Sequence, residues 1–327
     1  MKKTLIILTL AAVAFASCNG GFKRGEAGLL YDIHTDKSGP NIKPGDFAVF
    51  NIIEKTDADS VLYNSYDMGN PARLVIPPST NKNDLFAGLG YLSEGDSATI
   101  KISFDSIFRK QPRPANLKGK YVVYDVKIEK VFQKGNLSNE VFQGRIESYF
   151  KDQAAIAQKA EPEKIKKYVD DHKLKLTSTP SGLQYVINKQ GSGPNIIPGD
   201  TAEVFYVARL INGKVLETNN ADTAKKNKMF DARNPYKSFK LPVGQQGVIP
   251  AWGEGLQLLN KGSEATLVVP SKLAYGEQGS QQIGPFTPMV FDLQVVNVIH
   301  ADPNAPKPAA NPLLQQLTAP QGQATKK

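Results

Sequence analysis

A chain of 327 residues that is 40% hydrophobic can bury more than one core, because a domain usually takes about 100 to 200 residues. The net charge of +9 comes from lysines scattered along the chain, a pattern that usually serves solubility. A single cysteine excludes a disulfide within one chain, so we expect two domains that are stabilised by their cores.

Residues 1–17 have the features of a secretory signal. Lys2 and Lys3 precede the apolar stretch Leu5–Ala16, which is too short to span a bilayer stably. Removal of the signal takes away both lysines and lowers the net charge from +9 to +7. Export also argues against a nucleic-acid partner.

The only cysteine follows the signal directly, in the sequence Phe15-Ala16-Ser17-Cys18. This sequence resembles a bacterial lipobox, whose cysteine becomes the lipidated first residue of the mature protein. The alternative is an ordinary signal peptide with a stray thiol. We favour lipidation at Cys18, since an unpaired thiol is otherwise unusual in an exported protein. Residues 18–27 then form an anchor and linker, and the protein is placed in the cell envelope, facing the periplasm from the inner or outer membrane.

Residues 28–134 are the first of two copies of one sequence pattern. SGPNIKPGD at 38–46 recurs as SGPNIIPGD at 192–200, and GLLYDI from Gly28 recurs as GLQYVI from Gly182 at the same offset. GDSATIKIS from Gly95 matches GSEATLVVP from Gly262 at a longer offset. The second copy therefore contains a net insertion of about thirteen residues.

Residues 135–178 differ from both copies and predict a helical linker. Apolar residues recur at helical spacing among charged ones. They are Val141, Phe142, Ile146, Tyr149, Phe150, Ile165, Tyr168 and Val169. We expect Pro162 to divide this stretch into two helices, because proline removes a helical hydrogen bond.

Residues 179–300 are the second copy, and they predict half-buried antiparallel strands with one short helix. Apolar side chains alternate with polar ones at period two around Val204–Leu210 and around Phe291–Val295. Ile249–Leu256 predicts the helix, with Pro250 in its first turn. The remaining residues, 301–327, are rich in Pro, Ala and Gln and predict a disordered tail.

The motifs of the second copy, in their order, resemble the FKBP-type peptidyl-prolyl isomerases. They are SGLQYVINKQGSG, PGD, Tyr206, NGKVLET, VIPAWGEGLQLL, LAYGEQG and VFDLQVV. The resemblance spans nearly all of residues 181–299, and the helical lead-in ending in TPSGLQY is similar to that of bacterial membrane-associated members. It implies an α+β fold with two FKBP-like domains, each a bent antiparallel sheet with one short helix, joined by a helical spacer.

The resemblance also implies a site for X-Pro segments of unfolded or flexible exported proteins. Its predicted pocket is floored by Trp252 and walled by Tyr206, Phe239, Val248, Ile249 and Phe291. The backbone N–H of Ile249 and the hydroxyl of Tyr275 are expected to donate hydrogen bonds to the bound peptide. Rotation about an amide crosses a barrier of about 18–20 kcal/mol without a nucleophile, metal or cofactor. Singly, each aromatic would be interpreted as a core residue, whereas the joint pattern favours the pocket.

Three features depart from the family pattern. Leu216 and Glu217 stand where most active members have Phe and Asp, so a non-catalytic peptide-binding chaperone or interaction module is the alternative to an isomerase, which we favour. The segment ADTAKKNKMFDARNPYK either folds over the site as a lid or lengthens a surface loop, and we favour the loop. Ile283 belongs to a changed loop at the rim of the substrate site.

The first copy is expected to have lost its site. Ile52, Leu85 and Phe108 stand in the places of Tyr206, Trp252 and Tyr275, and Asn81 and Lys82 in those of Val248 and Ile249. Such a copy can still bind extended chains, pair with another subunit or hold the second copy away from a membrane; the sequence does not rank these roles or predict an oligomeric state. His34, His172 and His300 are far apart in sequence, so we predict no metal site.

Overall fold

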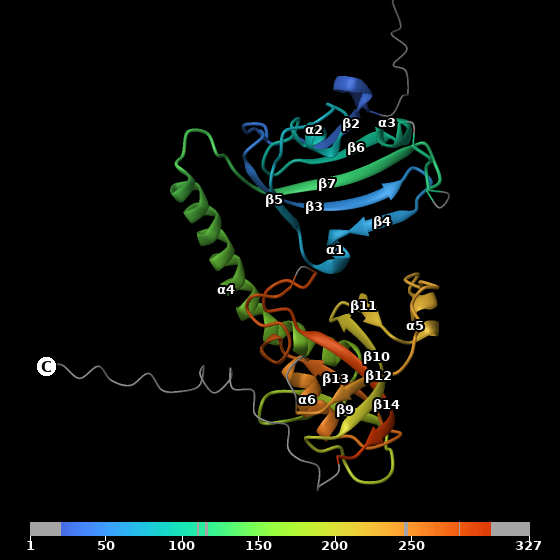
Figure 1. Ribbon diagram of the computed structural model, residues 1–327. Coiled ribbons are helices and arrows are strands. Elements are labelled where there is room, and N and C mark those ends of the chain that lie inside the picture. Colours follow the sequence, from blue (N-terminus) through green and yellow to red (C-terminus); the bar gives the residue numbers. More distant parts are fainter. Residues whose placement is uncertain (1–20, 110, 115–116, 245–247, 281, 302–327) are drawn as a thin grey trace, which may run out of the picture. The chain divides into compact units, whose positions relative to one another are not determined.

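The computed structural model describes residues 21–301 apart from 110, 115–116, 245–247 and 281 (Figure 1). The signal, the predicted lipidation residue Cys18 and the tail from residue 302 lie outside the described residues. The chain divides into two compact units. The first runs to Glu161 and includes Tyr275–Thr287, and the second comprises Pro162–Ala274 and resumes at Pro288.

The first unit contains a seven-stranded antiparallel sheet in the order β1-β2-β6-β7-β3-β4, with β5 also pairing with β3. Its strands are β1 (Lys23–Arg24), β2 (Leu30–Thr35), β3 (Phe47–Thr56), β4 (Val61–Asn64), β5 (Ala72–Val75), β6 (Ser97–Ser103) and β7 (Tyr121–Phe132). Its short helices are η1 (Glu26–Gly28), α1 (Ser65–Met68), α2 (Leu85–Leu89) and α3 (Phe104–Phe108).

The second unit repeats this topology strand for strand. Its seven-stranded antiparallel sheet has the order β8-β9-β13-β14-β10-β11, with β12 pairing with β10. The strands are β8 (Thr177–Ser178), β9 (Gln184–Lys189), β10 (Thr201–Leu210), β11 (Val215–Thr218), β12 (Phe239–Pro242), β13 (Glu264–Val269) and β14 (Met289–Ile299). The helices are α5 (Ala221–Lys226), α6 (Pro250–Gln257) and η2 (Ser271–Leu273). The predicted α+β fold with two sheets is confirmed.

One helix lies directly on each sheet at an equivalent glycine. A Cβ atom on Gly88 of α2 would come within 2.8 Å of the Ile100 side chain on β6. A Cβ atom on Gly255 of α6 would come within 2.6 Å of the Leu267 side chain on β13. Only glycine permits so close an approach. The helix that carries Trp252 is therefore held at a fixed height above its sheet.

The extra residues of the second copy lie in one connection. Between β4 and β5 the chain has seven residues (65–71), and between β11 and β12 it has twenty (219–238), a difference of thirteen. The length agrees with the insertion expected from the repeat. The segment expected as a loop contains the helix α5.

The expectation that Pro162 ends a helix is wrong. Asn139–Asp171 form one helix, α4, with Pro162 inside it. Proline removes one hydrogen bond to the preceding turn and can bend a helix without ending it. Strong helix formers flank it on both sides, including Lys159-Ala160-Glu161. Although α4 has 33 residues, no helix among the described residues is long and apolar enough to cross a membrane.

Each end of α4 packs on a different unit. In the first unit, Phe142 and Ile146 are buried, and the ring of Phe150 meets that of Phe47 edge-on at 5.8 Å. In the second unit, Ile165 and Tyr168 pack against Val268 of β13 and Val290 of β14. This packing stabilises the helix on both sides of the proline.

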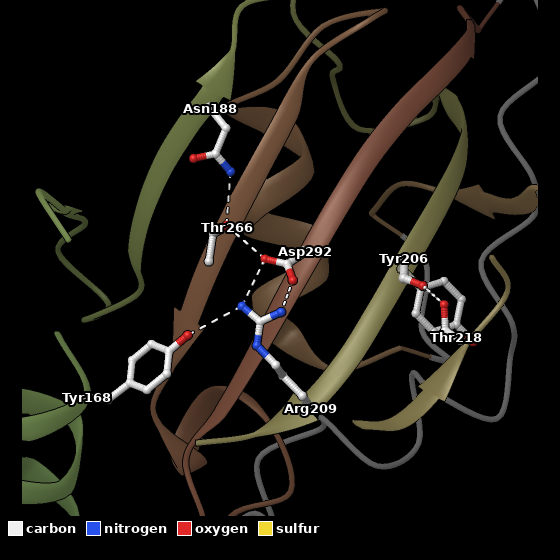
Figure 2. A network of polar contacts seen from close by, with 7 residues as sticks. All are labelled: Tyr168, Asn188, Tyr206, Arg209, Thr218, Thr266 and Asp292. Atoms are coloured by element: carbon white, nitrogen blue, oxygen red, sulfur yellow. Dashed lines mark hydrogen bonds and ion pairs between the residues drawn. The ribbon is translucent and has the colours of Figure 1, made fainter. Parts of the chain in front are cut away.

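A hydrogen-bond network of polar side chains crosses the outer face of the second sheet (Figure 2). The Asn188 amide donates to the Thr266 hydroxyl at 3.0 Å, and that hydroxyl donates to the Asp292 carboxylate at 2.8 Å. Arg209 forms two hydrogen bonds to the same carboxylate and a third, at 3.3 Å, to the Tyr168 hydroxyl of α4. The network thus fastens the end of α4 to β10 and β14.

The first sheet has a similar network at the equivalent positions. His34 lies 2.8 Å from the Thr99 hydroxyl, which donates to Asp125 at 2.6 Å. Lys55 pairs with the other Asp125 oxygen at 2.8 Å. Because both units keep this network, it stabilises the fold itself rather than a site found in one unit.

Candidate functional site

The second unit brings three aromatic rings around the indole of Trp252. The Trp252 ring lies 5.1 Å from that of Tyr206, 6.3 Å from that of Phe239 and 5.8 Å from that of Phe291, between ring centroids. The interplanar angles are 71° to 89°, so all three neighbours meet the indole edge to face. Tyr206 and Phe239 also approach each other at 6.4 Å. We call these four residues the aromatic cluster.

Four separate elements place these rings. Tyr206 lies on β10 opposite Leu293, and Phe291 lies on β14 opposite Ala208. Phe239 begins β12, and Trp252 lies in the first turn of α6. Pro250 occupies the start of α6, where its fixed φ and missing N–H suit a helix.

The cluster has a buried floor and an exposed rim. Trp252 is 6% exposed and Phe291 is 4% exposed, whereas Phe239 is 43% exposed. The indole Nε1–H of Trp252 is buried and has no hydrogen-bond acceptor within the described part of the chain. A buried donor without an acceptor costs about 1–3 kcal/mol, and such groups are typical of ligand sites. Sequence reasoning gave Trp252 an apolar role only and missed this donor.

Glu217 contacts the cluster directly. The Tyr206 hydroxyl donates to the Glu217 carboxylate at 2.7 Å. The Thr218 hydroxyl donates to the backbone carbonyl of Tyr206 at 2.6 Å, as Figure 2 shows. The tyrosine is therefore fixed at both its backbone and its hydroxyl by the end of β11. The glutamate at this departure from the family pattern orients a ring of the cluster.

Asn219 is a second residue that sequence reasoning missed. Its side-chain oxygen accepts the Tyr206 N–H at 2.7 Å. Its amide nitrogen donates to the carbonyls of Val204 at 2.9 Å and Lys237 at 3.0 Å. Asn219 therefore joins the strand of Tyr206 to both ends of the inserted connection. The only sequence signal was its position at the end of a strand.

The other predicted site residues lie on segments around α6 and β13. Ile249 caps α6 in an extended conformation, and its N–H has no acceptor among the residues that the structure describes. Val248, which precedes it, and Leu216 on β11 are half-buried. These positions do not test the roles predicted for Val248, Ile249 and Leu216, which stay predictions.

Tyr275 and Ile283 belong to the segment Tyr275–Thr287. Tyr275 is exposed and follows η2, and its carbonyl accepts the Gly279 N–H at 3.1 Å. Ile283 is buried, and its carbonyl accepts the Ser280 N–H at 2.7 Å. Gly279 has a φ of 64°, and a Cβ atom there would lie 2.2 Å from the Ile283 carbonyl. Only glycine suits this turn; the roles expected of Tyr275 and Ile283 stay predictions.

This part of the chain is similar to a known protein family. Residues 193–296 match the family model of FKBP-type peptidyl-prolyl cis-trans isomerases. After this match, we call residues 193–296 the FKBP-type domain. The matched segment includes all four residues of the aromatic cluster and the predicted Ile249 and Tyr275.

Two curated relatives of this domain are named as isomerases. The chain is 40% identical over 151 residues to the probable FKBP-type peptidyl-prolyl cis-trans isomerase FkpA of Neisseria meningitidis, covering 45% of this chain and 50% of the relative. It is 36% identical over 145 residues to FkpA of Escherichia coli, covering 44% and 47%. The chain therefore spans about half the length of these relatives. The crystal structure of Escherichia coli FkpA gives 26% identity and a TM-score of 0.40, over 51% of this chain and 75% of that one.

The first unit has no aromatic cluster at the positions equivalent to those of the FKBP-type domain. Ile52 is buried in its core, and Leu85 and Phe108 pack against that core. Lys82 has a φ of 56° and pairs with Glu26 at 2.8 Å. A charged residue in a left-handed turn thus replaces the extended cap, Ile249.

A tyrosine–carboxylate pair takes the place of a cluster ring in the first unit. Tyr124 lies on β7 at the position equivalent to Phe291, directly opposite Glu54 on β3. Burial, with a smaller effect of the Glu54 carboxylate, raises the pKa of Tyr124 to about 12. Burial also raises the pKa of Glu54. A polar pair here is unlike the apolar floor of the FKBP-type domain.

Metal-ligating side chains and further hollows are the other candidate sites. Across the described ranges, no group of three or more His, Cys, Asp or Glu side chains could hold a metal ion. A hollow of 210 Å³ lies on the second sheet, lined by polar side chains such as Asn188, Glu264 and Asp292 and, in similar measure, by apolar residues such as Phe205 and Val207. Tyr206 of the aromatic cluster also lines this hollow, so the strand β10 borders both sites.

Proposed function

We propose that the FKBP-type domain catalyses cis–trans isomerisation of X-Pro bonds in unfolded or flexible exported proteins. The aromatic cluster around Trp252 carries this proposal, because it offers a buried apolar floor with an exposed ring at its rim. The match of residues 193–296 to the isomerase family supports it.

The cluster suits a reaction that needs no reactive group. A planar amide is stabilised by charge separation, which water solvates, and twisting it costs about 18–20 kcal/mol. Aromatic walls withhold that water and favour the less polar, twisted amide over the planar one, which lowers the barrier. The Ile249 N–H and the Tyr275 hydroxyl would hold the peptide carbonyls on either side of the prolyl ring. Uncatalysed isomerisation takes about tens to hundreds of seconds, so modest barrier lowering has a large effect on folding.

The contact between Tyr206 and Glu217 favours an isomerase over a peptide-binding module without activity. The longer carboxylate still reaches the tyrosine hydroxyl, at 2.7 Å. The ring edge that faces Trp252 is therefore held in place despite the change from the family pattern. Both curated relatives cited above are also named as isomerases, not as binding proteins.

Refolding of a protein whose slow phase is limited by proline isomerisation tests the proposal. The full chain should accelerate this phase at substoichiometric concentration. Tyr275→Phe should reduce the acceleration roughly fivefold, because a neutral hydrogen bond contributes about 1 kcal/mol. Ile197→Ala, which changes an exposed side chain outside the cluster, serves as the control. Binding of the substrate without any acceleration would establish the peptide-binding module instead.

We further propose that the protein acts in the cell envelope, held by a lipid on Cys18. The secretory signal and the single cysteine that follows it support this location. Cells grown with a labelled fatty acid should incorporate the label into the wild-type protein and not into Cys18→Ala. Equal labelling of both proteins would contradict the anchor.

A further inference from the structure

The inserted connection, residues 219–238, is an ordered part of the FKBP-type domain. Asn220 caps α5 by accepting the Thr223 N–H at 2.9 Å, and Ala224 of this helix is buried. The Met229 N–H donates to the Ala224 carbonyl at 2.9 Å and closes the helix. Figure 1 shows α5 next to β11 in the second unit. The first unit has only α1 in this connection.

Two stacked aromatic rings follow α5. The rings of Phe230 and Tyr236 lie 5.1 Å apart with an interplanar angle of 8°. The Tyr236 hydroxyl accepts the Asp231 N–H at 2.9 Å, and the Lys225 ammonium lies 5.3 Å from the centre of the Phe230 ring. Phe230 is nevertheless 44% exposed. A large apolar ring that is fixed and exposed is typical of a binding surface.

The base of the connection is bonded to the aromatic cluster. Asn219, its first residue, bonds to the Tyr206 N–H and to the Lys237 carbonyl, near its end. Phe239 of the cluster begins the next strand and is 43% exposed. The connection therefore carries an exposed ring of its own and ends at an exposed ring of the proposed site.

The surface of the connection is basic. It contains five basic residues, Lys225, Lys226, Lys228, Arg233 and Lys237, and two acidic ones, Asp222 and Asp231. Both acidic side chains are paired within the connection, Asp231 with Arg233 at 2.7 Å and Asp222 with Lys225 at 3.8 Å. In the described part of the chain, Lys226, Lys228 and Lys237 have no acidic partner. An acidic ligand would complement this charge.

We propose that this connection binds the part of a substrate chain that flanks the X-Pro bond, where that part carries an aromatic residue among acidic ones. The inference rests on the proposed function, since the aromatic cluster holds the proline itself. Attachment at a second point raises the effective concentration of the X-Pro segment at the cluster. The contact lies away from the rotating amide, so it strengthens binding of the planar and twisted forms alike and lowers KM without changing kcat.

Two labelled sixteen-residue peptides test the proposal on the full chain. They share one central X-Pro bond, and one has a flank of Asp, Glu and Phe where the other has Ser, Gly and Ala. Fluorescence anisotropy should show about tenfold tighter binding of the acidic-aromatic peptide, as expected for a second attachment point. Phe230→Ala and the double variant Lys226→Ala, Lys228→Ala should each remove most of this preference. Added salt should weaken it, since the lysine contacts are exposed.

A second measurement separates this inference from the proposed function. On a tetrapeptide with one X-Pro bond, Phe230→Ala should retain wild-type activity, while KM for the acidic-aromatic peptide rises about tenfold at unchanged kcat. Ile197→Ala, whose side chain is also exposed and apolar, should change neither value. Absence of activity toward both substrates would refute the isomerase, yet the anisotropy preference would still stand. Equal binding of the two peptides, or equal losses in Ile197→Ala and Phe230→Ala, would overturn the inference.

Discussion

Trp252→Leu should lower kcat/KM for a tetrapeptide with one X-Pro bond by about 100-fold, because loss of apolar contact in a pocket costs about 1–3 kcal/mol. The equivalent position of the first unit is occupied by Leu85, so this fold accommodates a leucine there, three residues before the equivalent glycine, Gly88. Three rings meet the indole edge to face, and all three lose their partner at once. A peptide-isomerisation assay measures the change.

The matched control for this variant is Phe50→Leu. Phe50 is a buried aromatic of the first unit, 2% exposed, and it lies outside the cluster. Both variants should lose stability, since smaller side chains leave cavities, but only Trp252→Leu should lose activity. A similar activity in Trp252→Leu and the wild type would show that the cluster is merely core. Because Trp252 is the only tryptophan of the chain, its fluorescence in the wild type also reports peptide binding at the site.

The duplicated architecture could be predicted because the repeat preserves the residues that form turns and core. SGPNIKPGD and SGPNIIPGD recur at one offset, and the polar-apolar alternation of Val204–Leu210 determines which face of β10 is buried. The position of α6 was also predictable, since proline is favoured in the first turn of a helix, where Pro250 lies. Local rules decide these elements, so the sequence alone is sufficient for them.

Contacts between residues far apart in the sequence could not be predicted. Arg209, Thr266 and Asp292 alternate with buried residues and look like solvated side chains, but they form one network across three strands. Asn219 bonds to residues 206 and 237, and nothing local reveals that these lie together. The unpaired indole N–H of Trp252 is likewise a property of its surroundings.

Two errors in helix prediction have different causes. The rule that proline ends a helix failed at Pro162, because tertiary packing at Phe150 on one side and Tyr168 on the other stabilises α4. The helix α5 was missed although its signal was present, since Asn220 followed by Ala-Asp-Thr-Ala-Lys-Lys is a typical helix start. The second error could have been avoided from the sequence alone, whereas the first could be avoided only by knowing the fold.

Asp200→Asn should destabilise the second unit by about 3 kcal/mol at neutral pH, because hydrogen bonds to a charged group contribute about 1.5–3 kcal/mol. The carboxylate is 0% exposed. It accepts the backbone N–H groups of Ile197 and Ala301 and Nδ1 of His300, each at 2.9 Å. An asparagine has only one oxygen to replace two, so at least one donor at this buried site meets an NH₂ group. The melting temperature should fall by roughly 10 °C.

The pH dependence distinguishes a charge effect from a loss of shape. Burial alone would raise the pKa of Asp200. The Ile197 and Ala301 N–H groups and His300 lower it by more than burial raises it, so the pKa lies below its usual value. A carboxyl whose pKa is depressed by folding contributes stability above its unfolded pKa of about 3.9, and this stability is lost as the pH falls through the folded-state pKa. The difference between wild type and Asp200→Asn should therefore be largest at neutral pH and shrink in acid.

Urea unfolding followed by Trp252 fluorescence measures this difference in the second unit alone, because the first unit has no tryptophan. Asp46→Asn is the matched control, since Asp46 is buried at the equivalent position of the first unit and accepts the Lys43 and Lys134 N–H groups at 2.8 Å. It should leave the Trp252 transition unchanged. A constant difference between wild type and Asp200→Asn from about pH 7 to about pH 3 would show that Asp200 stabilises the fold through its shape and not through its charge.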